Sequence, residues 1–330
     1  MTHPLRLLVR RTRLVGSQKL YQSGVGRSIL PEEFYPSLTY TRESEMIDDP
    51  NLEIAGIIES KQPAMVARFG SVELRLLVQL SKAILSHSNM SNSRLARKGI
   101  DAFRWPTFRK KRFQEKMDYR PENATRFLQE YESAMGEVDL LAAWSFGESY
   151  FSHRLTSARI CRLDDLQPWL SSTPWSAALA GKKVVVVHPF KETIHQQFSE
   201  NRATLFEDQN VLPQFDLRIV QAFMPGVRDY KSPGQRFFEK IDVLANEVHQ
   251  EPFDVAIIGS GPNGFLLAAE VKRRGGIALH LGGMTQLLFG IRGKRWEDFG
   301  FSFFNDNWVR PLPADTPLDY AEHYDKGAYW

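Results

Sequence analysis

The sequence is poor in cysteine and in long apolar runs. Cys161 is the single cysteine in 330 residues, so an internal disulfide is impossible and a cysteine-type zinc site is excluded. This usage predicts a reducing, cytoplasmic compartment. No apolar run approaches the roughly 20 residues of a membrane-spanning helix. Hydrophobic residues still make up 42% of the chain, enough for one large α/β domain or two small ones.

Acidic residues are absent from residues 1–31. The basic side chains there are Arg6, Arg10, Arg11, Arg13, Lys19 and Arg27. The apolar residues that would share one side of a helix are Leu7, Leu8, Leu14 and Val15. A basic amphipathic segment can lie on an anionic membrane surface, which predicts peripheral attachment at the inner face of a membrane. A solvated segment and an Arg-rich, acid-poor transit peptide are the alternatives.

A second basic segment, residues 94–120, carries ten Lys or Arg residues with aromatic residues interleaved. Such a patch can meet an anionic acceptor, lipid headgroups or nucleic acid. No recognisable nucleic-acid module accompanies it, so no nucleic acid is expected as a partner. A solvated charged surface is the alternative interpretation.

The stretch 253–296 predicts a strand, a glycine turn, a helix and a parallel strand. The apolar run Val255 to Ile258 is too short and too β-branched for a helix. Glycines follow at 259, 261 and 264, then a helical apolar pattern, then a second buried run from Ile277 to Leu281. Glycine allows close approach of a ligand, and a helix start attracts phosphate. The pattern predicts a phosphate or nucleotide site, with a tight turn packing on the sheet as the alternative.

The glycine spacing is also that of a dinucleotide-binding turn. Two features argue against NAD or FAD. The acidic residue that holds the ribose, roughly 20 residues on, is missing, because the second strand runs into His280, Leu281 and Gly282. The motif also lies late in the chain. An NAD(P)-dependent oxidoreductase therefore stays as an alternative function.

A second informative stretch runs from Pro63 to Ser86. It predicts a strand over residues 64–69, a break at Gly70, a helix N-cap at Ser71 and an apolar helix beyond. Glu73 then lies in the first helical turn, at the carboxyl end of a strand, where open α/β sheets bind ligands. Complementation of the helix dipole is the other reading of a first-turn glutamate.

The remaining chain alternates between strands and helices, which predicts a parallel sheet with right-handed crossovers. A strand over 138–144 precedes a polar loop containing Glu148, and a strand over 183–187 precedes His188. Each residue could be a site group. The alternative for Glu148 is an ordinary carboxylate in a connecting loop, and the alternative for His188 is a structural histidine. Residues 161–180 are expected to be irregular, with short helical pieces.

We therefore predict an α/β fold: a Rossmann-like, mostly parallel sheet flanked by helices, with helical N-terminal additions. The expected organisation is a basic segment over 1–45, a single domain over 46–310 and a tail over 311–330 that packs on the domain.

Two stretches together resemble the GT-D fold glycosyltransferases, a bacterial family that uses sugar nucleotides. Arg68-Phe69-Gly70-Ser71-Val72-Glu73 resembles the family's Arg-Phe-Gly-Asp-Gly-Glu segment, whose Asp-x-Glu serves metal, donor and catalysis. Residues 254–283 resemble its strand, Gly-Pro turn, helix and second strand. The resemblance spans roughly residues 50–296. It implies transfer of a sugar from a nucleoside-diphosphate sugar, a UDP-sugar by analogy, to a glycan or lipid-linked acceptor in polysaccharide or glycoconjugate biosynthesis.

The resemblance and the positions of individual residues together assign expected roles, with Arg295, Glu148 and His188 chosen by position alone. Glu73 is the expected catalytic residue, as acceptor base or residual metal ligand, with Glu148 and His188 as alternates for the base. The residues expected to bind the sugar nucleotide are Arg68, Gly70, Ser71, Gly259, Ser260, Gly261, Pro262, Gly282 and Arg295. Ser71 replaces the family's aspartate, and a hydroxyl is a poor ligand for Mg²⁺ or Mn²⁺. Basic residues are the alternative to a metal at the diphosphate. A non-catalytic sugar-nucleotide or polysaccharide-binding protein and a membrane-surface scaffold remain alternative functions.

Overall fold

The computed structural model describes residues 46–86, 124–224, 228, 237–298, 300, 301, 303–318 and 327–330. The expectations for residues 1–45 and for the basic segment 94–120 lie outside these ranges. Within the described ranges, no helix is both long and apolar enough to cross a membrane.

A seven-stranded sheet forms the centre of the molecule, in the order β3-β2-β1-β7-β6-β4-β5, and every pairing is parallel. Four-residue runs such as Val255–Ile258 are buried throughout, as expected for strands covered on both faces. The strands are β1 (Ala64–Ala67), β2 (Leu140–Ala143), β3 (Arg159–Arg162), β4 (Lys183–His188), β5 (Asp216–Gln221), β6 (Val255–Ile258) and β7 (Ile277–His280).

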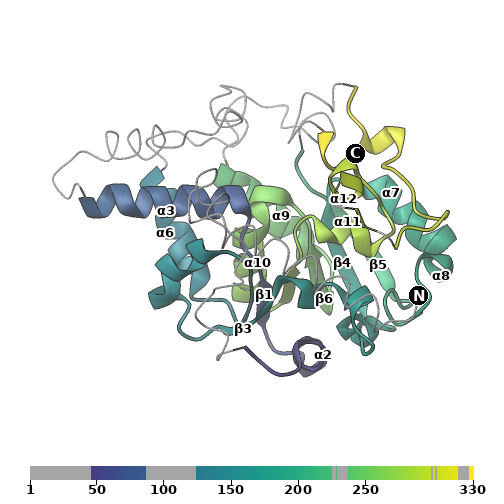
Figure 1. Cartoon of the computed structure of the whole chain (residues 1–330), viewed down its shortest axis with the longest axis horizontal. Coiled ribbons are helices and arrows are strands. Elements are labelled where there is room, and N and C mark those ends of the chain that lie inside the picture. Colours follow the sequence, from purple (N-terminus) through teal and green to yellow (C-terminus); the bar gives the residue numbers. More distant parts are fainter. Residues whose placement is uncertain are drawn as a thin grey trace, which may run out of the picture.

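Helices cover both faces of the sheet (Figure 1). The α-helices are α2 (Pro50–Ser60), α3 (Ser71–Ser86), α6 (Ala124–Met135), α7 (Lys191–Gln196), α8 (Arg202–Leu205), α9 (Phe237–Val248), α10 (Gly264–Arg273), α11 (Met284–Leu288) and α12 (Lys294–Asp298). The 3₁₀ turns are η5 (Phe146–Arg154), η6 (Leu163–Leu166), η7 (Pro168–Leu170), η8 (Trp175–Leu179), η10 (Gly261–Asn263) and η11 (Pro313–Asp315), and η9 (Gln197–Asn201) is a π-turn.

Alternate residues of each strand enter two separate apolar layers. Met65 and Ala67 of β1 join the layer under α3, α6, α9 and α10. Ala64 and Val66 join the layer with α2, α7, α11 and the C-terminal Trp330. This alternation is the period-2 geometry of a strand, and it confirms the predicted α/β fold with helices on both faces.

The connections reverse direction between β4 and β6. Helix α10 joins β6 to β7 over one face, whereas α7 and α8 join β4 to β5 over the other. Right-handed crossovers require opposite faces for opposite directions. The carboxyl ends of these two neighbouring strands therefore flank a topological switch point, where α/β sheets bind ligands.

The structure corrects three details of the sequence prediction. Strand β3 was not predicted, because only Ile160 and Cys161 are buried between exposed arginines and no alternation develops. The helix that the strand–helix alternation predicts between β4 and β5 is interrupted by the π-turn η9. Ser71 is the first residue of α3 rather than its N-cap, since Leu74 N–H donates to Gly70 O at 3.0 Å.

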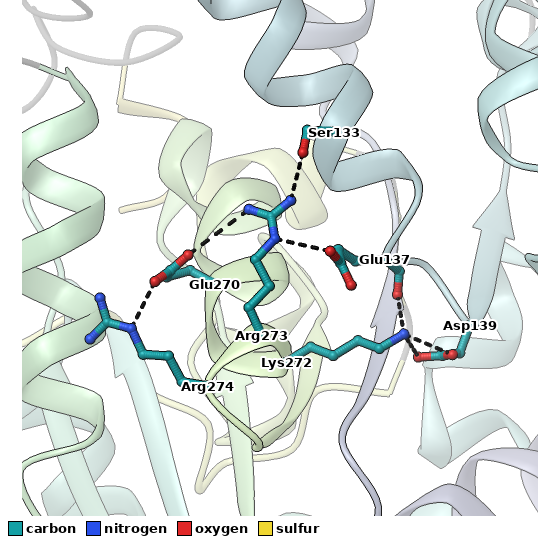
Figure 2. Close-up of polar contacts among 7 residues, drawn as sticks. All are labelled: Ser133, Glu137, Asp139, Glu270, Lys272, Arg273 and Arg274. Carbon is teal, nitrogen blue, oxygen red and sulfur yellow. Dashed lines mark hydrogen bonds and ion pairs between the residues drawn. The ribbon is translucent and has the colours of Figure 1, made fainter.

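The basic end of α10 is tied to the opposite edge of the sheet, away from the strand ends described below (Figure 2). Lys272 Nζ donates to Glu137 O at 2.7 Å and to Asp139 Oδ1 at 2.9 Å. Arg273 Nε donates to Glu137 Oε1 at 3.0 Å. Asp139 Oδ2 also accepts a hydrogen bond from the backbone N–H of Met65, the second residue of β1, at 2.7 Å. Lys272 and Arg273 therefore have a structural role, because they hold α10 against the residues that precede β2.

Candidate functional site

The predicted site residues come from separate segments but gather at the carboxyl edge of the sheet. Arg68 follows β1 directly, and Glu73 lies in the first turn of α3. Glu148 lies in the first turn of η5, after β2. Ser260 follows β6, and Gly282 follows β7. Because parallel strands all end at one edge, these groups share one side of the sheet.

Arg68 lies at the centre of this edge. Its guanidinium carbon is 5.2 Å from the centre of the Trp144 ring, within range of a cation–π contact. Burial lowers the pKa of Arg68, and the carboxylates Glu73 and Glu148 oppose that change. Its buried Nε makes no hydrogen bond within the described residues. Arg68 thus keeps donor capacity inside a partly desolvated site.

Glu73 is folded back over the start of its own helix. A Cβ added at Gly70 would overlap the Glu73 carboxylate, so the glycine provides the space for this conformation. The side chain is 8% exposed. Burial raises the pKa of Tyr131 and Glu73 raises it further, while the Tyr131 hydroxyl donates to Pro262 O at 3.1 Å. Glu73 therefore lies between a guanidinium and a phenol, close to the glycine turn.

Glu148 is fully buried, and burial raises its pKa to about 8, against the opposing effects of the Trp144 and Ser145 backbone and of Arg68. Both carboxyl oxygens accept from Trp144 N–H at 3.3 Å. Trp144 Nε1 in turn donates to Phe69 O at 2.9 Å. A group that is mostly protonated at neutral pH is poorly suited to accept a proton there, so Glu148 is better placed to support Trp144 than to act as a base.

The raised pKa of Glu148 predicts a pH dependence of stability. The folded state binds this proton more tightly than the unfolded chain, whose value is near 4.5. The free energy of unfolding therefore falls as pH rises from about 4.5 to about 8, by at most about 1.4 kcal/mol per pH unit. Glu148→Gln removes this component. Urea unfolding between roughly pH 6.5 and 8 should give the shallower slope in the variant, and equal slopes would contradict the assignment.

His188 ends β4, and its contacts favour packing over catalysis. Its Nδ1 accepts from Phe190 N–H at 3.0 Å. A Cβ at Gly259 would lie 2.6 Å from its Cδ2. Burial lowers the pKa of His188 to about 3, so the ring is neutral at physiological pH. His188 thus fills the space beneath the glycine turn at the switch point.

The glycine turn is bordered by buried polar atoms. Gly261 has φ +58°, a left-handed conformation that favours glycine. A Cβ at Gly259 would lie 2.7 Å from Thr285 Oγ1. The oxygens Ser260 Oγ, Asn263 Oδ1 and Thr285 Oγ1 are buried without a hydrogen bond in the described part of the chain. Such atoms are costly unless satisfied, which supports polar ligand binding here. Thr285 and Asn263 were missed, because Asn263 occupies a variable position of the glycine motif and Thr285 lies beyond the strand that follows it.

Arg295 reaches the same edge from α12 and contacts a residue that was also missed. Its Nη1 donates to the Tyr329 hydroxyl at 2.9 Å, across 34 residues of sequence. Both residues act electrostatically on Arg68. Arg295 lowers the pKa of the Arg68 guanidinium, and Tyr329 raises it. No local pattern could reveal Tyr329, because its role depends on a contact between the tail and α12.

A small hollow of about 60 Å³ adjoins the site between α3 and η5. Its lining comes from Ser71, Leu74, Arg75, Val78, Trp144, Ser145 and Gly147. Trp144 lines this hollow and also contacts Arg68.

The side chains described at this edge of the sheet do not fit a divalent metal. Ser71 offers a hydroxyl rather than a carboxylate, and the acidic side chains Glu73 and Glu148 both interact with Arg68. The described residues contain no group of three or more His, Cys, Asp or Glu side chains that could hold a metal ion. Hard cations need several oxygen ligands, whereas this edge of the sheet gathers guanidinium groups.

Comparisons with known proteins find similarity at the level of the fold. No family model and no curated protein match the chain. Two solved structures are similar, at 15% and 16% identity, each covering 85% of this chain and 95% of the other at a TM-score of 0.36. One is the selenomethionine-substituted structure of domain of unknown function 1792 (DUF1792). The other is described as DUF1792 with a distinct glycosyltransferase fold, in agreement with the predicted resemblance.

Proposed function

We propose that this protein is a glycosyltransferase that moves a sugar from a nucleoside-diphosphate sugar, a UDP-sugar by family resemblance, to an acceptor hydroxyl. The observation that carries the proposal is the meeting of Arg68 and Glu73 at the carboxyl edge of a parallel sheet. The glycine turn after β6 lies at the switch point of the same edge. A diphosphate needs cations and backbone N–H groups, whereas an acceptor hydroxyl needs a carboxylate base.

The reaction follows from these groups. The acceptor oxygen attacks the anomeric carbon of the donor sugar, and the bond from that carbon to the β-phosphate oxygen breaks. The hydroxyl proton passes to Glu73, and the nucleoside diphosphate leaves with the bonding electron pair. Arg68 and Arg295 stabilise the charge that develops on the leaving group. Glu148 keeps Trp144 in place beside Arg68 through its contact with the Trp144 backbone.

The acceptor we propose is a glycan or a lipid-linked glycan in the cytoplasm. Its support is the sequence of the basic segments 1–31 and 94–120, which carry the charge that an anionic acceptor or membrane surface would meet. The family resemblance gives the same acceptor class.

Ligand-induced stabilisation tests the function. We expect UDP or another nucleoside diphosphate to raise the unfolding temperature of the full chain, because a ligand at 100 times its Kd adds about 2.7 kcal/mol to the free energy of unfolding. NAD⁺, NADH and S-adenosylmethionine serve as competitors of other classes. Stabilisation by NAD(H) alone would replace the proposal with an oxidoreductase, and no response to any nucleotide would contradict donor binding.

A further inference from the structure

Two adjacent glycines after β7 bring together groups from opposite ends of the described chain. A Cβ added at Gly282 would lie 3.3 Å from Arg68 Nη1, and one added at Gly283 would lie 3.2 Å from Tyr329 Cε1. Gly282 also has φ +62°. Arg68 and Tyr329 therefore pack against neighbouring positions of one turn, and both reach the carboxyl end of β7.

Arg295 completes this group. It donates to the Tyr329 hydroxyl at 2.9 Å, and its guanidinium carbon is 4.9 Å from the centre of the Tyr329 ring. Burial is the largest cause of the lowered pKa of Arg68, and Arg295 lowers it further. Two guanidinium groups are thus held within electrostatic reach of each other, an arrangement that an anion between them would stabilise.

The segment carrying Tyr329 is fixed by backbone hydrogen bonds. Arg295 N–H donates to Ala328 O at 2.8 Å, and Lys294 N–H donates to Trp330 O at 2.9 Å. Gln286 Nε2 donates to Tyr329 O at 3.2 Å. The ordered end of the chain lies beside α11 and α12 (Figure 1). Tyr329 is therefore preorganised, which lowers the entropic cost of using it in binding.

We propose that Arg68, Arg295 and the Tyr329 hydroxyl form a metal-free subsite for the diphosphate of a nucleoside diphosphate. This inference rests on the proposed function. Guanidinium forks match phosphate oxygens. The Tyr329 oxygen accepts from Arg295, so its own proton is available for a phosphate oxygen. The three groups supply positive charge and hydrogen-bond donors in place of the charge that a divalent cation would supply beside a carboxylate at position 71.

The test is calorimetric titration of the full chain with UDP, GDP and ADP, each paired with its nucleoside, in EDTA and in Mn²⁺. We expect one diphosphate to bind in EDTA, more tightly than its nucleoside. Arg295→Ala should weaken that binding by about 10- to 100-fold and Tyr329→Phe by about 3- to 10-fold. Nucleoside binding should stay unchanged in both variants. Arg274→Ala, which removes an arginine paired with Glu270 on α10, is the matched control.

The opposing results separate the two proposals. Diphosphate binding that needs Mn²⁺ would overturn the metal-free subsite and leave the glycosyltransferase proposal in place. Binding in EDTA that survives both Arg295→Ala and Tyr329→Phe would remove these residues from the subsite. Failure of every diphosphate to bind in either condition would overturn both proposals.

Discussion

Glu73→Gln should lower the rate of sugar transfer by about 10²- to 10⁴-fold, the usual contribution of a general base. Glutamine keeps the size and hydrogen-bonding shape of the side chain but cannot accept a proton from the acceptor hydroxyl. Gly70 leaves space for the folded-back side chain, and glutamine is no larger than glutamate. The free energy of unfolding should therefore change little, and donor binding should persist, as measured by urea unfolding and titration.

A matched control is available in another first-turn glutamate. Glu53 lies in the first turn of α2 and pairs with Arg159 at the start of β3, far from the strand ends that form the site. Glu53→Gln makes the same chemical change and should leave transfer at the wild-type rate. If Glu73→Gln instead kept its activity and lost stability, Glu73 would be a structural partner of Arg68 and Tyr131.

The largest effect on stability is expected at Gly264, where a methyl group has no space. A Cβ there would overlap the ring of His280, which is 3% exposed and held by a contact of 3.2 Å between its Nδ1 and Ile258 O. Neither the ring nor the strands around it can move without disturbing the core. Gly264→Ala should therefore cost about 3 kcal/mol of unfolding free energy, measured by urea denaturation.

Gly56 provides the opposite case on another helix. It lies within α2, and nothing lies within 4 Å of a Cβ added there. Gly56→Ala should stabilise the protein by about 0.5–1 kcal/mol, because alanine loses less backbone entropy in a helix. If both alanine variants changed stability by the same amount and sign, the close approach of His280 to Gly264 would not be the cause.

Strong local patterns accounted for most of the fold. The run Val255–Ile258, the glycines after it and the run from Ile277 were each sufficient to place β6, α10 and β7. Strand β3 was missed, because a short edge strand with two buried residues has too little periodicity. Its existence depends on pairing with β2, which is a tertiary contact.

Single residues of the candidate site could be predicted from the sequence, but their arrangement in space could not. Sequence position and the family resemblance together indicated Arg68, Glu73 and Arg295 as candidates. Burial distinguished the roles of Glu148 and His188, because it raises the pKa of one and lowers that of the other. Their local sequences contain nothing that would fix the depth of either side chain.

The sequence by itself determined the alternating strand–helix order, the glycine turn after β6 and the presence of a serine, not a carboxylate, at position 71. These depend on residue type and spacing along a short stretch, which set backbone geometry and ligand chemistry locally. Only the tertiary structure decided that Tyr329 meets Arg295 and approaches Arg68. Contacts between residues far apart in the chain depend on how the sheet and its covering segments pack, and no local pattern encodes them.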